Sequence, residues 1–320
     1  MTRWTWHGGG LEAARRHFGD GDWLDLSTGI NPRPWPVRDV DIDWHRLPEP
    51  EALSRLEFAA AAHFGCDPRN VCAVPGTEVA LRLVGQHIGG RACHRAATYR
   101  THTQIIPDSR AAEPSESTRG TLILANPNNP DGVMLSRDEV HALLASRGAD
   151  EWLLLDEAFI DADHTASLAS LIGEKQRLVI FRSFGKFFGL AGLRLGFVLG
   201  PEAILAPLRA LLGAWPISAA AIAVGTRAYE DTAWIAATRD RLRSDAAKMD
   251  ACLAAAGHQP TGASPLFRLI DTPNAAALFE RLARHRILTR PFADHPTWLR
   301  IGLAPSATAL DRLAKALHDG

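Results

Sequence analysis

Short apolar runs alternate with helical patterns along the first two thirds of the chain. The apolar runs, of the length of buried strands, are NVCAV (70–74), TLILA (121–125), EWLLL (151–155), RLVIF (177–181) and RLGFVLG (194–200). Helical spacing of apolar positions follows in 78–88 and in 136–146, where Ser136 and Glu139 fit a capping box. This alternation predicts a mainly parallel sheet with helices on its faces.

The pattern changes after residue 215. Long alanine-rich helical segments (218–256) precede the apolar run LFRLID (266–271), a helical pattern (274–285) and the apolar run WLRIGLA (298–304). These elements predict a second, smaller α+β domain. In the first part of the chain, DSRAAEPSESTRG (108–120) has the composition of an exposed connector.

Length, composition and charge narrow the possible functions. At 320 residues and 46% hydrophobic content, the chain is long enough for about two domains. The 35 basic and 36 acidic residues leave a net charge of −1, which argues against nucleic acid or an anionic membrane as a partner. The sequence has no signal-peptide pattern and no long uncharged apolar run, so we expect a soluble cytoplasmic protein.

The cysteines agree with this expectation. Cys66, Cys72, Cys93 and Cys252 form no CxxC pair and no metal-ligand spacing. We therefore expect packing residues in a reducing compartment, and neither disulfides nor a bound metal.

Polar motifs follow the predicted strands, where an α/β sheet carries its functional loops. Gly76, Thr77 and Glu78 open a helix, which is either an ordinary helix start or a phosphate site formed by free N–H groups. In ANPNNPDG (125–132), prolines flank the asparagines. Such a pattern is typical of an ordinary turn and also of a stiff loop that holds a side-chain amide in one orientation. Asp156 directly follows a buried strand, where a carboxylate caps a helix or needs a cationic partner.

A single lysine lies among glycines and aromatic residues in FRSFGKFFGLAGLRLGF (181–197). The neighbours of Lys186 include Phe184, Phe187 and Phe188. Desolvation by such neighbours favours the free amine that attacks a carbonyl group. The alternative is a surface lysine whose stem covers apolar side chains.

Together, these motifs resemble the fold-type I, pyridoxal-phosphate-dependent aminotransferase superfamily over most of the chain. Ser183, Lys186 and Arg194 match its S-x-x-K-x7-R element. The resemblance implies that Lys186 binds pyridoxal 5′-phosphate covalently and that Asp156 keeps the pyridine nitrogen protonated, so that the ring is an electron sink. It also implies phosphate binding by Ser183, Arg194, Gly76, Thr77 and Glu78, a hydrogen bond from Asn129 to the ring hydroxyl, and stacking of Tyr99 on the ring.

The same resemblance implies an architecture. The expected fold is α/β, with a large cofactor-binding domain (41–214) built on a seven-stranded, mainly parallel sheet flanked by helices. A smaller C-terminal α+β domain (215–320) follows, and an N-terminal arm (1–40) joins the small domain and the entrance of the active site. A homodimer is expected by analogy.

Two N-terminal stretches resemble the threonine-phosphate decarboxylase branch of this superfamily, which acts in cobalamin biosynthesis. WHGGGLEAA (6–14) resembles its HGG opening, and LDLSTGINPRPWP (24–36) resembles its D-x-S-x-x-I-N-P element. The resemblance implies a set of substrate-binding residues: His7, Gly8, Gly9, Ser27, Asn31 and, for the carboxylate, Arg300. The branch also has a histidine where this chain has His102, although a purely structural role is equally open.

The chain departs from the superfamily at several positions. Phe159 replaces a frequent tyrosine, which removes one hydrogen bond to the ring oxygen of the cofactor. In RLPEP (46–50), Leu47 replaces a tyrosine by which histidinol-phosphate aminotransferases reach the phosphate of the neighbouring subunit. Asp131 replaces the threonine of NPTG, and the chain is short around residues 89–120. The Leu47 departure weakens an aminotransferase assignment more than a decarboxylase assignment.

The expected reaction is decarboxylation of the phosphorylated amino acid L-threonine O-3-phosphate to (R)-1-amino-2-propanol O-2-phosphate. Two alternatives stay open: an aminotransferase of the histidinol-phosphate type, which needs 2-oxoglutarate, and a non-catalytic cofactor-binding or regulatory protein on the same fold. A nucleotide site has little support, because GLAGLRLG (189–196) lacks the Walker spacing. The reaction depends on which bond at Cα of the substrate is held perpendicular to the cofactor ring, and a sequence does not show that geometry.

Overall fold

The computed structural model describes residues 4–113 and 119–318. The chain divides into two compact units. The larger unit contains residues 34–129 and 134–237, and the smaller unit contains the described parts of 1–33, 130–133 and 238–320. In the described part of the chain, no helix is both long enough and apolar enough to cross a membrane.

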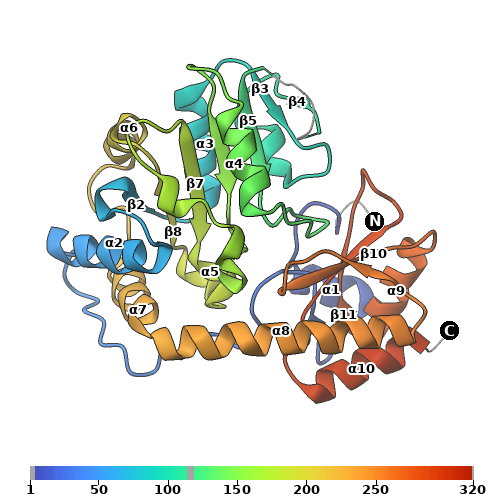
Figure 1. Ribbon diagram of the computed structural model, residues 1–320. Helices are drawn as coiled ribbons and strands as arrows, with labels where there is room; N and C mark the ends of the chain where they lie inside the picture. The colour runs from blue at the N-terminus through green and yellow to red at the C-terminus, as the bar shows by residue number, and fades with distance from the viewer. Residues whose placement is uncertain (1–3, 114–118, 319–320) are drawn as a thin grey trace. The chain divides into compact units, whose positions relative to one another are not determined.

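A seven-stranded sheet forms the centre of the larger unit (Figure 1). The strand order is β2-β8-β7-β6-β5-β3-β4, and β8 is antiparallel to its two neighbours whereas the other pairs are parallel. The strands are β2 (Val71–Val74), β3 (Ala92–His94), β4 (Arg110–Ala111), β5 (Thr121–Ala125), β6 (Leu153–Asp156), β7 (Leu178–Ser183) and β8 (Gly196–Leu199). The prediction of a seven-stranded, mainly parallel sheet is confirmed. Of the predicted connector 108–120, residues 114–118 lie outside the described residues.

Helices cover this sheet because their apolar faces need a partner surface. They are α2 (Pro50–Phe64), α3 (Thr77–Ile88), α4 (Arg137–Ala145), α5 (Phe184–Phe187), α6 (Glu202–Leu212) and α7 (Ala219–Glu230). Apolar residues of α3 and α6 form one buried cluster with alternate strand residues such as Ile123 and Val179. The capping box of Ser136 and Glu139 is present at the start of α4, and α2 and α7 pack side by side (Figure 1).

The smaller unit contains a four-stranded antiparallel sheet in the order β12-β13-β10-β9, orange to red in Figure 1, and a parallel pair of β1 and β11. Its strands are β1 (Leu24–Asp25), β9 (Pro260–Thr261), β10 (Phe267–Asp271), β11 (Ile287–Leu288), β12 (Arg290–Pro291) and β13 (Trp298–Gly302). Its helices are α1 (Leu11–Phe18), α9 (Ala275–Arg284) and α10 (Ala307–His318), together with most of α8 (Thr232–Ala255). The α+β character expected for this part is confirmed.

The division between the units falls within α8, after Ala237. The sequence pattern suggested a boundary near residue 214, before α7. The larger unit extends further because α7 packs on α2, which the change in sequence pattern does not reveal.

The four cysteines are free thiols. Cys72 and Cys93 are buried in strands of the larger unit, and burial raises the pKa of the Cys72 thiol to about 12. Both therefore pack as small apolar residues, as expected.

Candidate active site

The loop between β2 and α3 forms the first part of the candidate site. Gly76 precedes α3 with φ of 89° and ψ of 149°, a conformation that glycine adopts at little cost. A Cβ atom on Gly76 would lie 2.6 Å from Nη2 of Arg194, so the absence of a side chain also admits the guanidinium. The open N–H groups of a helix start and a cation therefore meet here, which suits a phosphate group.

The ends of β7 and β8 bring Ser183 to the same region. Ser183 pairs with Gly196 across the two strands. A Cβ atom on Gly196 would lie 3.0 Å from the backbone nitrogen of Thr77, so β8 lies directly against the start of α3. The structure thus gathers four residues predicted for the cofactor phosphate: Gly76, Thr77, Ser183 and Arg194. Their role as phosphate ligands stays a prediction.

Asp156 ends β6, and its side chain is 9% exposed. One carboxylate oxygen, Oδ2, lies 3.0 Å from Nε2 of His102, and the other accepts a hydrogen bond from the N–H of Ala158 at 3.0 Å. Nδ1 of the fully buried His102 lies 2.8 Å from Oγ1 of Thr98. Both ring nitrogens of His102 are therefore engaged, and the histidine fixes the orientation of the Asp156 carboxylate.

The Glu78 side chain turns toward the segment that carries Tyr99. Its Oε2 accepts hydrogen bonds from the hydroxyls of Thr101 at 2.7 Å and Tyr99 at 3.1 Å, and Oε1 accepts from Arg82 at 2.9 Å. Burial alone would raise the pKa of Glu78, but these hydrogen bonds hold it below its usual range. The rings of Tyr99 and His102 meet edge to face, with centroids 5.6 Å apart. The sequence motif pointed to the backbone of Glu78 and did not reveal these side-chain contacts.

Lys186 lies in the short helix α5. Its Nζ is 5.5 Å from the centre of the Phe159 ring, an arrangement of an amine over an aromatic face. Phe184, Phe187 and Phe188 are fully buried, whereas Lys186 is of intermediate exposure. The aromatic residues therefore anchor the helix, and the partly buried Lys186 does not lie on an ordinary solvated face.

Asn129 lies in the loop after β5 and is 8% exposed. The side chain of Asn126 accepts from the N–H of Leu135 at 2.9 Å and donates to its carbonyl oxygen at 3.0 Å. Nδ2 of Asn128 donates to the carbonyl oxygen of Ala97 at 2.8 Å. The loop is thus fixed on both sides of the Asn129 amide, as an orienting role requires.

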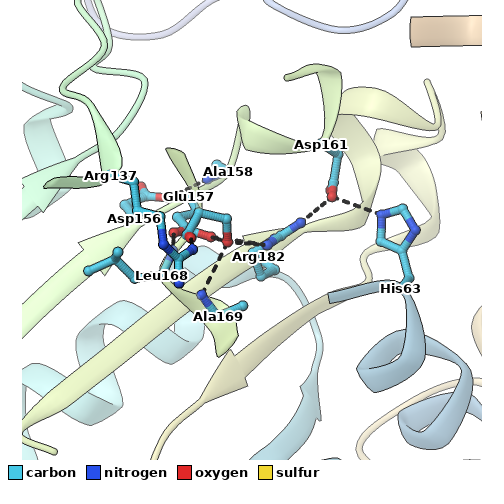
Figure 2. A network of polar contacts seen from close by, with 10 residues as sticks. His63, Arg137, Asp156, Glu157, Ala158, Asp161, Leu168, Ala169 and Arg182 are labelled. Carbon is cyan, nitrogen blue, oxygen red and sulfur yellow. Dashed lines mark hydrogen bonds and ion pairs between the residues drawn. The ribbon is translucent and has the colours of Figure 1, made fainter. Parts of the chain in front are cut away.

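A buried ionic network adjoins the segment that follows Asp156 (Figure 2). Arg182, which precedes Ser183 on β7, is 2% exposed and pairs with Glu157 at 3.0 Å and with Asp161. Nε2 of His63 lies 3.0 Å from Oδ1 of Asp161. The network therefore ties the segment after Asp156 to the strand that leads to Lys186. Sequence reasoning missed it, because only burial distinguishes these charges from surface charges.

The two carboxylates of this network, Asp161 and Glu157, differ in the direction of their pKa shifts. Burial alone would raise the pKa of Asp161, but Arg182 and His63 hold it well below its usual range. Burial raises the pKa of Glu157 despite the opposite effect of Arg182. The guanidinium of Arg182 thus lies between two carboxylates whose pKa values are shifted in opposite directions.

The N-terminal glycine segment packs within the smaller unit. The N–H of Gly9 donates to Oγ of Ser27 at 2.6 Å, and a Cβ atom on Gly8 would lie 2.4 Å from the carbonyl oxygen of Ser27. Nη2 of Arg300 donates to the same carbonyl oxygen at 2.8 Å. The structure thus brings together four of the residues predicted to bind substrate.

The other two predicted substrate residues differ in exposure. Asn31 is 1% exposed, and its Oδ1 accepts from the N–H of Arg33 at 3.1 Å and from Arg241 at 3.4 Å. His7 is exposed, and its ring meets that of Trp6 edge to face at 6.2 Å. The structure fixes the amide of Asn31, and a contact of His7 with substrate stays a prediction.

A second buried arginine, which motif reading missed, lies opposite Arg300. Arg290 in β12 pairs with Arg300 in β13, and the two residues are 6% and 3% exposed. Each guanidinium lies over an aromatic ring, Arg290 over Phe292 at 4.8 Å and Arg300 over Phe267 at 5.0 Å. Two buried cations on facing positions favour an anionic ligand. The stretch around Arg290 is too short to show a strand pattern, so this pairing could not be predicted.

Comparison with known proteins adds independent information. Residues 92–317 match the family described as aminotransferase class I and II. A threonine-phosphate decarboxylase from Sinorhizobium sp. is 41% identical over 97% of this chain and 97% of its own. A protein of the same name from Pseudomonas aeruginosa is 38% identical over 97% of this chain and 96% of its own.

Solved structures share the fold at lower identity. Histidinol-phosphate aminotransferase from Sinorhizobium meliloti, in complex with pyridoxal-5′-phosphate, has a TM-score of 0.84 and 22% identity, and the match covers 97% of this chain and 93% of that one. L-threonine-O-3-phosphate decarboxylase from Porphyromonas gingivalis has a TM-score of 0.76 and 20% identity, covering 91% and 97%. The resemblance inferred from the motifs is confirmed: the chain belongs to the aminotransferase class I and II family.

Proposed function

We propose that this protein decarboxylates L-threonine O-3-phosphate to (R)-1-amino-2-propanol O-2-phosphate, with pyridoxal 5′-phosphate as its cofactor. The observation that carries the proposal is the similarity, over 97% of the chain, to two threonine-phosphate decarboxylases at 41% and 38% identity. The product is a precursor of the nucleotide-loop linker of cobalamin, so the expected pathway is cobalamin biosynthesis.

The residues of the larger unit fit this cofactor. A phosphate group suits the point where Arg194 approaches Gly76, because the guanidinium there lies beside the N–H groups at the start of α3. The buried Asp156 carboxylate, held by His102, suits a protonated pyridine nitrogen. When bound, the cofactor supplies an electron sink for the bond that breaks at Cα.

The remaining cofactor contacts are assigned to three residues. We assign the covalent attachment to Lys186, the hydrogen bond to the ring oxygen to Asn129, and the ring stacking to Tyr99. Phe159 has no hydroxyl to add a second hydrogen bond to that oxygen. The family resemblance supports these assignments, together with the fixed loop around Asn129.

Lys186 is the residue best suited to move a proton. The residue is of intermediate exposure, and its Nζ lies 5.5 Å from the centre of the Phe159 ring, which neither donates nor accepts protons. We assign to this amine the donation of the proton that replaces the departing CO₂ on Cα. His102 and the N–H of Ala158 hold the carboxylate of Asp156 in a fixed orientation.

The smaller unit suits a substrate with two anionic groups. Arg300 is assigned to the substrate carboxylate, and Arg290 on the facing position adds a second positive charge. The candidates for contacts with the phosphate ester are His7, Gly8, Gly9, Ser27 and Asn31. A carboxylate together with a phosphate distinguishes L-threonine O-3-phosphate from unphosphorylated amino acids, which carry one of these charges.

Product analysis tests the proposal. The purified protein is incubated with pyridoxal phosphate and L-threonine O-3-phosphate, and CO₂ and aminopropanol phosphate are measured with and without 2-oxoglutarate. We expect both products at equal rates in the two conditions. Glutamate formation from 2-oxoglutarate with histidinol phosphate as amino donor, without CO₂ release, would identify an aminotransferase instead.

We also propose a homodimer in the cytoplasm. Several large apolar side chains of the larger unit are exposed: Trp44, Leu47, Phe58, Leu211 and Trp215. A hollow of about 360 Å³, lined in part by Leu53, Leu212 and Trp215, has the apolar character of a subunit interface. Light scattering should give twice the mass of one chain. The four free thiols suit a reducing compartment.

A further inference from the structure

The segment from Thr98 to Gln104 is held by side chains from two other elements. Glu78 and Arg82 lie one turn apart on α3. Glu78 accepts from the hydroxyls of Tyr99 and Thr101, and Arg82 donates to Oε1 of Gln104 at 3.3 Å. On the other side, His102 contacts Asp156 at the end of β6. The segment is thus fixed between the start of a helix and the end of a strand.

Glu78 holds Tyr99 at the atom farthest from the backbone. A hydrogen bond at the phenol oxygen restricts tilting of the whole ring, because the other end of the ring is attached to the chain. The carboxylate of Glu78 is suited to this task, because its second oxygen, Oε1, lies 2.8 Å from Nη2 of Arg82. The guanidinium of Arg82 favours the ionised form of the carboxylate. The edge of the His102 ring, 5.6 Å away, limits the ring in a second direction.

We propose that Glu78 is a positioning residue that fixes the Tyr99 ring over the plane of the cofactor. The inference rests on the cofactor site of the proposed function and adds a role for the side chain, beyond the phosphate contact of the backbone. A purely structural role, as a first-turn acid that stabilises α3, predicts no coupling between Glu78 and Tyr99.

The first test uses the protein without cofactor. Both tyrosines of the chain are replaced by 3-fluorotyrosine, their titration is followed by ¹⁹F NMR, and Tyr99→Phe assigns the signals. Burial and the negative charge of Glu78 raise the pKa of Tyr99. Glu78→Gln keeps an oxygen acceptor but removes the charge, so the Tyr99 phenol should titrate roughly half a pH unit or more lower. An unchanged Tyr99 titration overturns the proposal.

Glu139→Gln is the matched control, because Glu139 is also an acidic residue in the first turn of a helix. It lies in the capping box of α4 and contacts Ser136. We expect this variant to leave the Tyr99 titration unchanged. An equal shift in both variants would mean that Glu78 acts through general charge and would overturn the proposal.

The second test measures cofactor binding in Glu78→Ala, Tyr99→Phe and the double variant, through the dissociation constant and the circular dichroism band of the bound cofactor. Each single change should weaken binding by roughly tenfold, the equivalent of one charge-assisted hydrogen bond. The double variant should be no weaker than the weaker single variant, whereas additive losses would overturn the proposal. None of these readouts needs CO₂ release, so the inference and the proposed reaction can fail separately.

Discussion

The candidate residues of the two units are held in different ways. In the larger unit, several of them end a strand or begin a helix inside a continuous motif, as Asp156 does at the end of β6 and Ser183 at the end of β7. In the smaller unit, the carbonyl oxygen of Ser27 accepts a hydrogen bond from Arg300, 273 positions away. Local strand and helix geometry thus places the candidate cofactor residues, whereas pairing of distant segments places the candidate substrate residues.

The two units also treat buried positive charge differently. Arg182 lies between two carboxylate partners within the larger unit. Arg290 and Arg300 occupy facing positions on neighbouring strands of the smaller unit. The carboxylates around Arg182 suit a supporting role, and two adjacent cations suit the binding of an anion. The comparison can be tested by removing members of each set.

The largest effect is expected for the amine of the larger unit. Lys186→Ala should lower kcat by about a thousandfold or more, because it removes both the attachment of the cofactor and the proton donor. The absorbance band of covalently bound cofactor should also disappear. Lys175→Ala, at an exposed position, is the control and should behave like the natural protein. Retention of both activity and absorbance in Lys186→Ala would contradict the assignment of the covalent attachment and the proton donation to Lys186.

Removing the compensated cation should affect stability. Arg182→Met leaves Asp161 and Glu157 buried without their cationic partner, so the free energy of unfolding should fall by about 3–5 kcal/mol. Urea denaturation measures the change. Arg177→Met removes an arginine that pairs with the exposed Asp150 at 3.5 Å and should cost less than about 1 kcal/mol. Equal losses in the two variants would contradict the distinction between supporting and surface charges.

Removing the facing cations should affect substrate use and leave the fold largely intact. Arg300→Gln and Arg290→Gln should each lower kcat/KM for L-threonine O-3-phosphate by about a hundredfold, because a buried charge pair with the substrate is lost. Cofactor affinity should stay unchanged. Arg284→Gln, whose side chain is 72% exposed, serves as the control. If cofactor affinity fell while kcat/KM for the substrate stayed the same, Arg290 and Arg300 would belong to the cofactor site instead.

The smallest effect concerns acid stability. The pKa of Asp161 is below its ordinary value of 3.8 in the folded protein. Its contribution to stability is therefore present above about pH 4 and is lost as the pH falls through the lower folded-state pKa. Between about pH 5 and pH 3, the urea midpoint of Asp161→Asn should fall less than that of the natural protein. Parallel curves would show that Arg182 does not lower this pKa.

Glu157 should have the opposite effect on the pH dependence of stability. Its pKa is raised in the folded protein, so its contribution is present below its ordinary pKa of 4.5 and is lost as the pH rises through the folded-state value. Glu157→Gln should therefore flatten the fall in stability between about pH 4.5 and that higher folded-state value, measured as the urea midpoint against pH. Together, the two single variants test whether the pKa is lowered at Asp161 and raised at Glu157.

Several features of the molecule followed from the sequence. Periodicity located five strands of the sheet (β2, β5, β6, β7 and β8) and helices α3 and α4, and the motif around Lys186 pointed to the family. In both cases the information lies in consecutive residues. Local order also placed Asp156 and Ser183 at strand ends and Asn129 in the loop that follows a strand. The capping box at Ser136 is another local feature that the structure bears out.

Tertiary structure alone decided which of these side chains meet and which charges are buried. The contact of His102 with Asp156, the tether between Glu78 and Tyr99, and the facing pair of Arg290 and Arg300 each join segments that are far apart or too short to show a pattern. Such contacts depend on strand register and on the removal of water from charges. Neither property can be read from residue types alone, because the same side chains on a solvated surface have different partners and different pKa values.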